Sequence, residues 1–366
     1  MWLRYSRKRK QMENSFVGKD VRHHLPKVED PHSLLRQVHF FLSMGKEPST
    51  QVTGQLKRCI RELRRHEGME FIDNVAKTCD GEFAYKIFKW LSDYDFLRYI
   101  DPDVAKLTEC PQKKRGAKVP NALVHTLRVL KFCNERELIW CGLYHDVGKL
   151  DTIDSGTRPY FGHELYSAQR FYLMMIATKS NVFLGTRFYY VIRNHMEPHD
   201  YQRRVKKKWT PNDIHLFMVK CGGLGNALMT VDLAIADKRA SHNVDSFIEP
   251  YEELKQRCIE MADIAPKHSD RILCPICLAK KSEEIELQFK TSGLLNCSSC
   301  GTVYRLGENS ELIPLNLTYV DAEIVDVKKE SSRGPRHGGS EKETGESQSE
   351  EEQGTPEENE ESPKAA

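Results

Sequence analysis

Four histidine and aspartate residues in this chain have the types and spacing that metal chemistry requires. His125 is followed by the adjacent pair His145-Asp146 and, much later, by Asp237. Two imidazoles and a carboxylate that converge between helices form a site for a borderline divalent cation. A lone histidine is more often a packed core residue, but an adjacent His-Asp pair facing a third His is harder to explain by packing. The sequence therefore predicts a metal site at these four residues.

The elements around His125 and His145 must bring them together. Residues 121–133 and 136–147 have helical spacing, and the link at Asn134 and Glu135 is so short that the helices must run antiparallel. With a rise of about 1.5 Å per residue, positions about nine residues before the turn and about ten after it lie level. We therefore expect the two imidazoles to face each other.

Asp237 occupies the middle of an expected helix over 226–241, among alanines. A bare buried carboxylate is costly, so this position favours a paired or metal-bound one, and small neighbours let helices approach closely. Asp232 lies five residues earlier, roughly 140° around the helix. Asp237 is therefore the predicted ligand, and Asp232 is not.

His163 and His195 are candidates for additional roles. His163 follows a glycine at the expected start of a helix over 163–178, and His195 ends an expected helix over 186–196, before Pro198. Each can hold a second metal with Asp146 as the bridge, bind phosphate or move protons. Each can equally be a polar surface or capping residue.

Two nearby residues receive opposite interpretations. Lys149, one turn beyond His145, is placed to contact a phosphate oxygen. His199 would neighbour His195 only if the helix continued through Pro198. Since proline interrupts helices, His199 is read as a surface or capping group.

The order His125, His145-Asp146, Asp237 resembles the H…HD…D signature of the HD-domain metal-dependent phosphohydrolases. The surrounding segments resemble the HD-type body of bacterial tRNA nucleotidyltransferases and poly(A) polymerase-like proteins, over about residues 70–262: HTLRVL, HDVGK, GHE…SA, RNHMEPH and LAIADKRA. The resemblance implies a multi-helix body that binds a divalent ion and hydrolyses phosphoesters. Its implied metal ligands are His125, His145, Asp146 and Asp237, and its implied catalytic residues are Asp146, Lys149, His163 and His195.

Departures from this family restrict the activity. Segments 93–95 and 101–103 read Asp-x-Asp, but they lie in or beside helical patterns without the glycine turn of a nucleotidyltransferase head. Addition of CCA to tRNA is therefore disfavoured. The chain also lacks a Glu-Asp pair after His145-Asp146 and a Gly-Tyr-Pro after RNHMEPHDY, which disfavours hydrolysis of (p)ppGpp and of cyclic-di-GMP.

A second metal group consists of cysteines. Two Cys-x2-Cys pairs are separated by 19 residues, a spacing that fits a four-thiolate structural zinc site: Cys274, Cys277, Cys297 and Cys300. Short β-prone segments around them (EIELQF, TVYRL and LNLTYV) predict a zinc ribbon, and a redox-active pair is the alternative. The other seven of the 11 cysteines follow no pattern, and most are expected to be small buried residues.

Composition gives the expected organisation: a mainly α protein, with a multi-helix HD domain, a small β zinc ribbon and a disordered acidic tail. Residues 341–366 contain ten Glu and two Lys, a charge of −8, so the rest of the chain carries +10 against a total of +2. The expected parts are a basic, poorly ordered N-terminus (1–30), a helical N-terminal region (31–115), the HD domain (116–265), the ribbon (270–320) and the tail (327–366).

Apolar repeats over 34–42, 71–76 and 87–94 predict helices in the N-terminal region, and Pro102 is expected to end them. The segment 111–120 is expected to be an exposed loop. Basic clusters lie at 113–118 and 203–208 and are compatible with a polyanionic partner.

These features predict a cytoplasmic hydrolase. No apolar run suits a membrane span, and no apolar stretch follows the basic N-terminus as in a secretory signal. The predicted substrate is a phosphoester of RNA or a nucleotide, including terminal or 2′,3′-cyclic phosphates, with Mn, Mg, Co, Ni, Fe or Zn in the HD site. The alternatives are a module that binds RNA or protein on an HD scaffold, and a nucleotidase for (d)NMP or dNTP. The ribbon and the tail are candidate surfaces for a protein partner.

Overall fold

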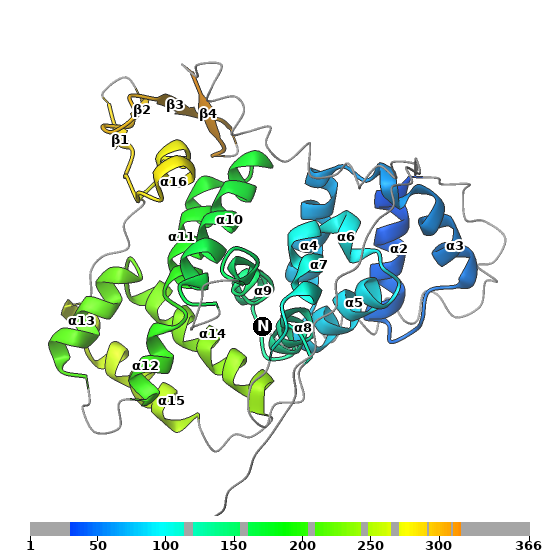
Figure 1. The fold of residues 1–366 in the computed structure, drawn as a ribbon, viewed down its shortest axis with the longest axis horizontal. Coiled ribbons are helices and arrows are strands. Elements are labelled where there is room, and N and C mark those ends of the chain that lie inside the picture. Colours follow the sequence, from blue (N-terminus) through cyan, green and yellow to red (C-terminus); the bar gives the residue numbers. More distant parts are fainter. Residues whose placement is uncertain are drawn as a thin grey trace, which may run out of the picture. The chain divides into compact units, whose positions relative to one another are not determined.

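The computed structural model describes residues 30–112, 120–153, 160–203, 209–242, 248–264, 271–290, 293–308 and 310–315. The protein is mainly helical and carries a small antiparallel sheet in its C-terminal part (Figure 1). Three predicted features lie outside these residues: the basic N-terminus, the acidic tail and most of the basic loops at 113–118 and 203–208. Within the described ranges no single helix is both long and apolar enough to cross a membrane; the helices at Pro211–Lys220 and Leu224–Ser241 meet that criterion only when combined across a 95° bend.

The first helices form where apolar residues repeat at three and four. The predicted stripe lies on one face of the first helix, and all of its members except the partly buried Phe41 are buried: Leu34, Leu35, Val38 and Leu42. The carboxylate of Asp30 caps that helix by accepting bonds from two backbone N–H groups. The elements of this region are α2 (Pro31–Ser43), α3 (Thr50–Cys59), η2 (Ile60–Glu62), α4 (Arg65–Thr78), α5 (Gly81–Asp93), α6 (Leu97–Ile100), α7 (Pro102–Lys106) and η3 (Leu107–Glu109), where η marks a 3₁₀ turn.

Pro102 does not end the first helical region, contrary to the sequence-based expectation. It is the first residue of α7, and Asp101 accepts hydrogen bonds of 3.0 Å from the N–H groups of Asp103 and Val104. Proline is well suited to this position because its fixed φ is helical and its missing N–H would have no partner in the helix. The Asp-x-Asp segment at 101–103 is therefore a helix start.

The central helices follow the expected order, with shifted ends. The helix expected at 136–147 stops at Tyr144, and the one expected at 186–196 spans Val182–Arg193. A short helix over Glu197–Arg203 was not expected; it forms because Pro198 lies in its first turn, where proline is tolerated. The central elements are α8 (Ala122–Leu130), α9 (Arg136–Tyr144), η4 (Val147–Leu150), α10 (His163–Ala177), α11 (Val182–Arg193), α12 (Glu197–Arg203), α13 (Pro211–Lys220), α14 (Leu224–His242), α15 (Glu249–Glu260) and η6 (Ala262–Ile264).

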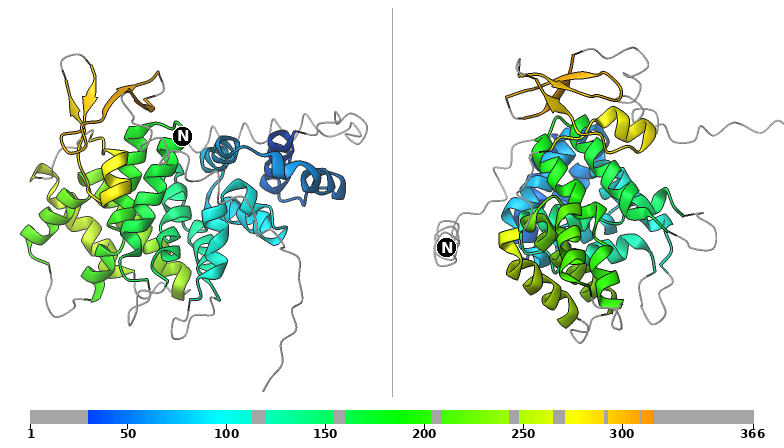
Figure 2. Two further views of the ribbon diagram at one scale, coloured as in Figure 1. Left: turned by 45° about the horizontal axis from the view of Figure 1, so that its top comes forward. Right: turned by 90° about the vertical axis from the view of Figure 1, so that its left-hand side faces the viewer.

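In its described residues the cysteine segment, coloured yellow to orange in Figure 2, has one helix and four short strands in the order β1-β2-β3-β4. Every pairing is antiparallel, with Leu295 opposite Tyr304 and Arg305 opposite Ile313. The last strand spans Leu312–Pro314; of the expected strand segment LNLTYV only Leu315 is described, and residues 316–320 lie outside the described residues. The elements are α16 (Pro275–Lys281), β1 (Gln288–Phe289), β2 (Leu295–Asn296), β3 (Val303–Leu306) and β4 (Leu312–Pro314).

One continuous apolar cluster connects α2 to the cysteine segment. Tyr172 of α10 donates a hydrogen bond of 2.7 Å to the carbonyl of Leu273, and Tyr189 of α11 donates one of 2.8 Å to Glu284. A second cluster joins residues of α12 to α15. Because α10 begins at His163 and α11 ends just before His195, the packing of these helices positions two candidate site residues.

Candidate metal centre

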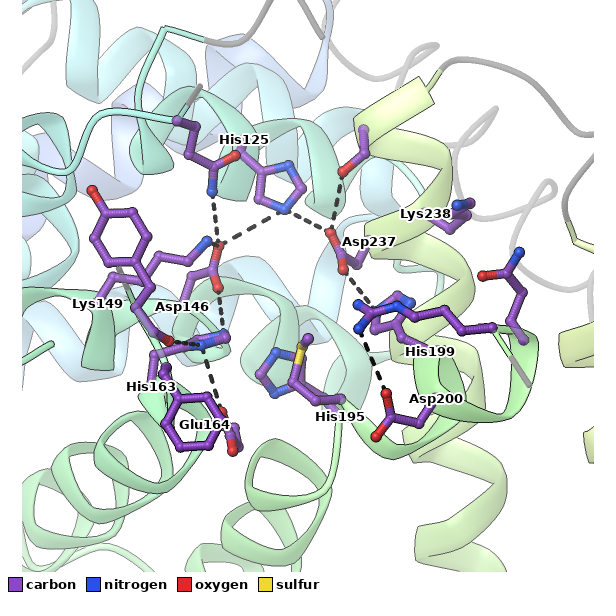
Figure 3. A pocket seen from close by; sticks show the side chains of 18 of the residues that line it. His125, Asp146, Lys149, His163, Glu164, His195, His199, Asp200, Asp237 and Lys238 are labelled. Atoms are coloured by element: carbon purple, nitrogen blue, oxygen red, sulfur yellow. Dashed lines mark hydrogen bonds and ion pairs between the residues drawn. The ribbon is translucent and has the colours of Figure 1, made fainter. Parts of the chain in front are cut away.

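Five of the six histidines and aspartates predicted from the sequence line one pocket, together with Lys149. Its volume is about 900 Å³, and its wall includes residues of α8, η4, α10, α12 and α14. The predicted residues in the wall are His125, Asp146, Lys149, His163, His195 and Asp237. His145 is buried directly behind Asp146. The elements thus bring together side chains that are more than 100 residues apart in the chain (Figure 3).

His125 and His145 meet as their helices predict. Their ring centroids are 5.6 Å apart, and both rings are buried. His145 caps the C-terminus of α9, and its Nδ1 lies 2.8 Å from the carbonyl oxygen of Gly142. A carbonyl only accepts, so Nδ1 carries the proton and the Nε2 of a neutral ring holds a lone pair. That Nε2 is buried without a hydrogen bond of normal geometry to any described residue.

Asp146 is the centre of the group. It is 2% exposed, and its two oxygens face different partners. Oδ2 lies 2.5 Å from Nζ of Lys149 and 3.3 Å from Nε2 of His145, whereas Oδ1 lies 3.2 Å from Nε2 of His163. Burial alone would raise the pKa of Asp146, but the charges of His145 and Lys149 hold it well below its usual range. Asp146 is therefore an ionised carboxylate with a cation buried beside it.

A close contact between η4 and α10 sets the position of His163. A Cβ on Gly148 would lie 2.1 Å from the carbonyl oxygen of His163 and 2.3 Å from the backbone nitrogen of Ser167. The N–H of Gly148 donates a 2.8 Å bond to the hydroxyl of Ser167. Only glycine allows this approach. The glycine of HDVGK and the serine of GHE…SA thus hold Asp146 and His163 together.

His163 and His195 repeat the arrangement of His145. Nδ1 of His163 lies 2.8 Å from the carbonyl oxygen of Tyr160, and Nδ1 of His195 lies 2.7 Å from that of Ile192. Their ring centroids are 5.2 Å apart. Burial lowers the pKa of His195 well below its usual value, with a further contribution from His163. His195 is therefore a neutral imidazole whose Nε2 lone pair is available.

The buried carboxylate and the imidazole lone pairs together form a site suited to a cation. One ligand atom from each of His125, His145 and Asp146 lies within 4.8 Å of the others, and the same holds for Asp146, His163 and His195. Lone pairs and an ionised carboxylate that face each other away from water repel, unless a proton or a metal ion lies between them. Burial alone would lower the pKa of His145, but Asp146 raises it, so a proton is one occupant. The donor set of imidazole nitrogen and carboxylate oxygen suits divalent transition metals.

Asp237 contacts two histidines of the site. Its Oδ1 lies 2.7 Å from Nε2 of His125 and its Oδ2 lies 2.8 Å from Nε2 of His199. Asp232 faces elsewhere and pairs with Lys255 at 2.6 Å, as its position on the helix predicts.

The interpretation of His199 as a surface or capping group was wrong. The residue is buried, lines the pocket and has its Nδ1 2.7 Å from the hydroxyl of Tyr251 on α15. The error arose from Pro198, which starts α12 instead of preventing a helix. The spacing RNHMEPH, with two histidines four residues apart, was the available signal.

Gln112 was missed altogether. Its amide Nε2 donates to Oδ2 of Asp146 at 3.4 Å, although it lies in a segment predicted to be an exposed loop. A β-bridge between Pro111 and Asn121 holds this segment beside α8. Nothing in the local sequence distinguishes Gln112 from the polar residues that follow it.

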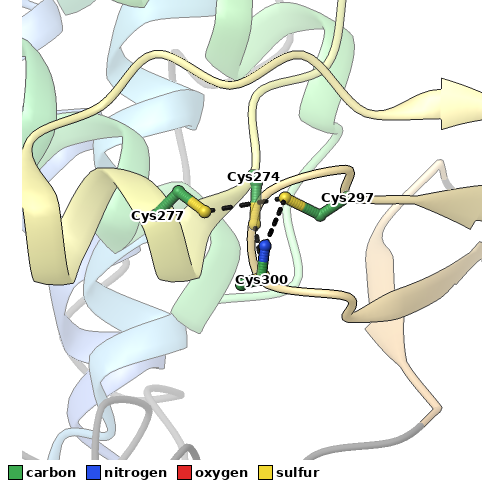
Figure 4. A group of neighbouring side chains, drawn as sticks. All are labelled: Cys274, Cys277, Cys297 and Cys300. Carbon is green, nitrogen blue, oxygen red and sulfur yellow. Dashed lines mark hydrogen bonds between the residues drawn. The ribbon is translucent and has the colours of Figure 1, made fainter.

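The four predicted cysteines form a separate group (Figure 4). Their sulfur atoms all lie within 4.8 Å of one another, and the pairs Cys274–Cys300 and Cys277–Cys297 are each 3.6 Å apart. Cys277 lies on α16, and Cys297 and Cys300 lie on the turn after β2. Gly301 has a φ of +73° in that turn, which suits a tight knuckle. Six of the other seven cysteines are buried, as expected.

The cysteine thiols differ in their ease of ionisation. Burial raises the pKa of Cys277 to about 11, and it also raises that of Cys274. Burial alone would raise the pKa of Cys300 too, but hydrogen bonding with Thr302 lowers it to about 7. The sulfurs of the three buried cysteines and of the exposed Cys300 can together hold a metal as thiolates, and four such ligands leave no position open for substrate.

The comparisons with known proteins give no relative for this chain. No protein-family model matches it, and none of the curated proteins gives a significant match.

Proposed function

We propose that this protein is a metal-dependent phosphohydrolase of the HD type that acts on a phosphoester of RNA or a nucleotide. The observation that carries the proposal is the environment of Asp146: a buried, ionised carboxylate with imidazoles on both of its oxygens and the ammonium of Lys149 at 2.5 Å. A purely structural ion pair would not require several imidazole nitrogens with lone pairs beside it. In a phosphohydrolase, those nitrogens would bind the metal ion and the ammonium would bind the phosphate.

The donors fit a divalent ion, and each residue has a role in the proposal. His125, His145, Asp146 and Asp237 hold the ion, while His163 and His195 complete a second position that shares Asp146. When bound, the ion supplies Lewis-acid chemistry, because it polarises a phosphoryl oxygen and activates water. The identity of the ion among Mn, Mg, Co, Ni, Fe and Zn is part of the test below.

In this proposal Lys149 binds the phosphate group of the substrate. Its ammonium is buried in the wall of the pocket and lies 5.7 Å from the ring centroid of Tyr160. If Asp146 held a divalent ion, its carboxylate would attract Nζ of Lys149 less strongly, and the ammonium could contact a phosphoryl oxygen instead. Where only one ion is bound, Nε2 of His195, which burial keeps neutral, can instead accept a proton from the attacking water.

The cysteine group is proposed to hold a structural zinc ion. The ribbon packs on α10 and α11 through Tyr172 and Tyr189, so zinc there would brace the helices next to His163 and His195. The proposal places the protein in the cytoplasm, with the ribbon as the surface for RNA or a protein partner.

The decisive experiment uses the purified protein with each of the six metals on a panel of phosphomonoesters and phosphodiesters, including RNA with terminal or 2′,3′-cyclic phosphates. Asp237→Asn should abolish metal-dependent hydrolysis. Asp232→Asn is the matched control, because it changes the same residue type on the same helix, outside the pocket. The proposal fails if no substrate is hydrolysed with any metal, or if Asp237→Asn and Asp232→Asn have equal rates.

A further inference from the structure

Phe161 stands out because it is a large apolar residue in the wall of a charged pocket. Its exposed fraction is 71%, the highest value among the large hydrophobic side chains of the described residues. It lines the same pocket as Asp146 and His163 and lies two residues before His163 in the chain. Burial of such a ring is normally favourable, so its exposure here needs a reason.

The turn that carries Phe161 is fixed at several points. Tyr160 has a φ of +66° and Gly162 a φ of +78°, so left-handed residues flank Phe161 on both sides. This conformation is unfavourable for a residue with a Cβ, such as Tyr160. Hydrogen bonds hold it in place: the N–H of Tyr160 donates to Thr152 at 3.0 Å, its hydroxyl donates to Pro111 at 2.9 Å, and its carbonyl accepts from His163 at 2.8 Å. Phe161 is thus presented on a braced turn.

The pocket is larger than a phosphate group alone would fill. Its volume of about 900 Å³ is at the upper end of the roughly 300–1,000 Å³ typical of pockets for whole small molecules. The proposed metal-ligating side chains are buried, whereas Phe161 and Ile153, which line the same pocket, are exposed. Lys238 and Arg203 also line the pocket and give it cationic side chains apart from Lys149. A ligand with an anionic group and a flat apolar group matches these features.

We infer that Phe161 is a stacking residue for the nucleobase of the substrate. The inference rests on the proposed function and deepens it, since it assigns a base-binding subsite to the phosphoester site. Aromatic side chains stack on any base, because every base has a π-face, so this subsite favours nucleotides over sugar phosphates without selecting one base. The base belongs either to a free nucleotide or to the terminal residue of an RNA strand.

The test compares substrates that share a phosphate but differ in the base. Steady-state kinetics of the metal-loaded full chain are measured with AMP, ribose 5-phosphate and a tetraribonucleotide that carries a terminal phosphate. Phe161→Ala should raise KM about tenfold for AMP or for the tetranucleotide and leave KM for ribose 5-phosphate unchanged, with kcat retained. Phe161→Trp should keep the wild-type KM. A change with the tetranucleotide alone identifies RNA as the source of the base.

Phe289→Ala is the matched control, because Phe289 is 58% exposed on β1 and does not line the pocket. The inference is overturned if Phe161→Ala weakens AMP and ribose 5-phosphate equally, or if neither base-containing substrate is affected. If the wild type hydrolyses none of the three, these monoesters are not its substrates, and the proposed function is judged on the wider panel described above. Equilibrium dialysis with AMP and the tetranucleotide then decides on the subsite: about tenfold weaker binding by Phe161→Ala supports it, and equal binding refutes it.

Discussion

Replacing Asp146 with Asn should destabilise the metal-free protein through Lys149. The ammonium of Lys149 is buried, and Asp146 is the carboxylate that lies 2.5 Å from it. Asn is nearly the same size but has no charge, so the substitution leaves a buried cation without its counter-ion. Breaking a buried pair in this way costs about 3–5 kcal/mol. A loss of ~3 kcal/mol corresponds to a fall in Tm of roughly 4–6 °C, because the entropy of unfolding is about 2.1 cal/mol/K per residue.

The second variant separates this cause from general disruption of the site. Lys149→Met in the Asp146→Asn background removes the unpaired charge and keeps an unbranched side chain, so it should recover most of the lost free energy of unfolding. Urea unfolding of metal-free protein at pH 7, followed by circular dichroism, measures all four members of the cycle. Asp93→Asn is the control, since Asp93 pairs with Lys89 on the surface of α5, where an ion pair contributes at most about 1 kcal/mol.

The pH dependence gives an independent check. The pKa of Asp146 is held well below its usual range in the folded protein. Its carboxylate therefore contributes stability above the unfolded pKa of about 4, and this contribution is lost as the pH falls further. Asp146→Asn should remove this part of the acid sensitivity. If Asp146→Asn is as stable as the wild type, and Lys149→Met restores nothing, then Lys149 carries no buried charge and our account of the anion site is wrong.

Three further predictions follow from the two metal groups. The affinity of the Asp146 site for a metal ion should rise between pH 5.5 and 8. Asp146 raises the pKa of His145, and a metal ion must displace the proton from His145 before it can bind there. Calorimetric titration with Mn²⁺ measures this affinity, and an affinity that does not change with pH contradicts the prediction. His199→Gln should weaken metal binding about tenfold, since His199 supports Asp237 from 2.8 Å; an unchanged Kd shows that Asp237 is held in other ways. Cys297→Ser should lose about one zinc ion per chain and destabilise the segment 271–315, which elemental analysis and hydrogen exchange detect; retention of the zinc excludes the four-thiolate assignment.

Local sequence patterns were sufficient for much of the fold and for most of the site. Apolar spacing predicted α2, α4, α5 and the central helices, because burial of one face requires a repeat that is visible within a few residues. The Cys-x2-Cys pairs predicted the cysteine group for a similar reason, because the two cysteines of a pair are three residues apart and are visible as one local pattern. The ends of the elements were less predictable, as Pro102 and Pro198 demonstrate, since proline both ends helices and begins them.

The contacts of the site depended on tertiary structure. Gln112, His199 and Phe161 each lie in segments whose local pattern is that of a loop or a chain break, and only packing brings them to the pocket. Asp237 reaches its partners because α14 packs on α8 and α12, which a hydrophobic pattern cannot specify. The sequence shows which residue types are available as ligands. Asp146 contacts both imidazoles and a buried ammonium only because the helices that carry these groups converge. Distances between residues far apart in the chain are set by side-chain packing, and no local spacing encodes them.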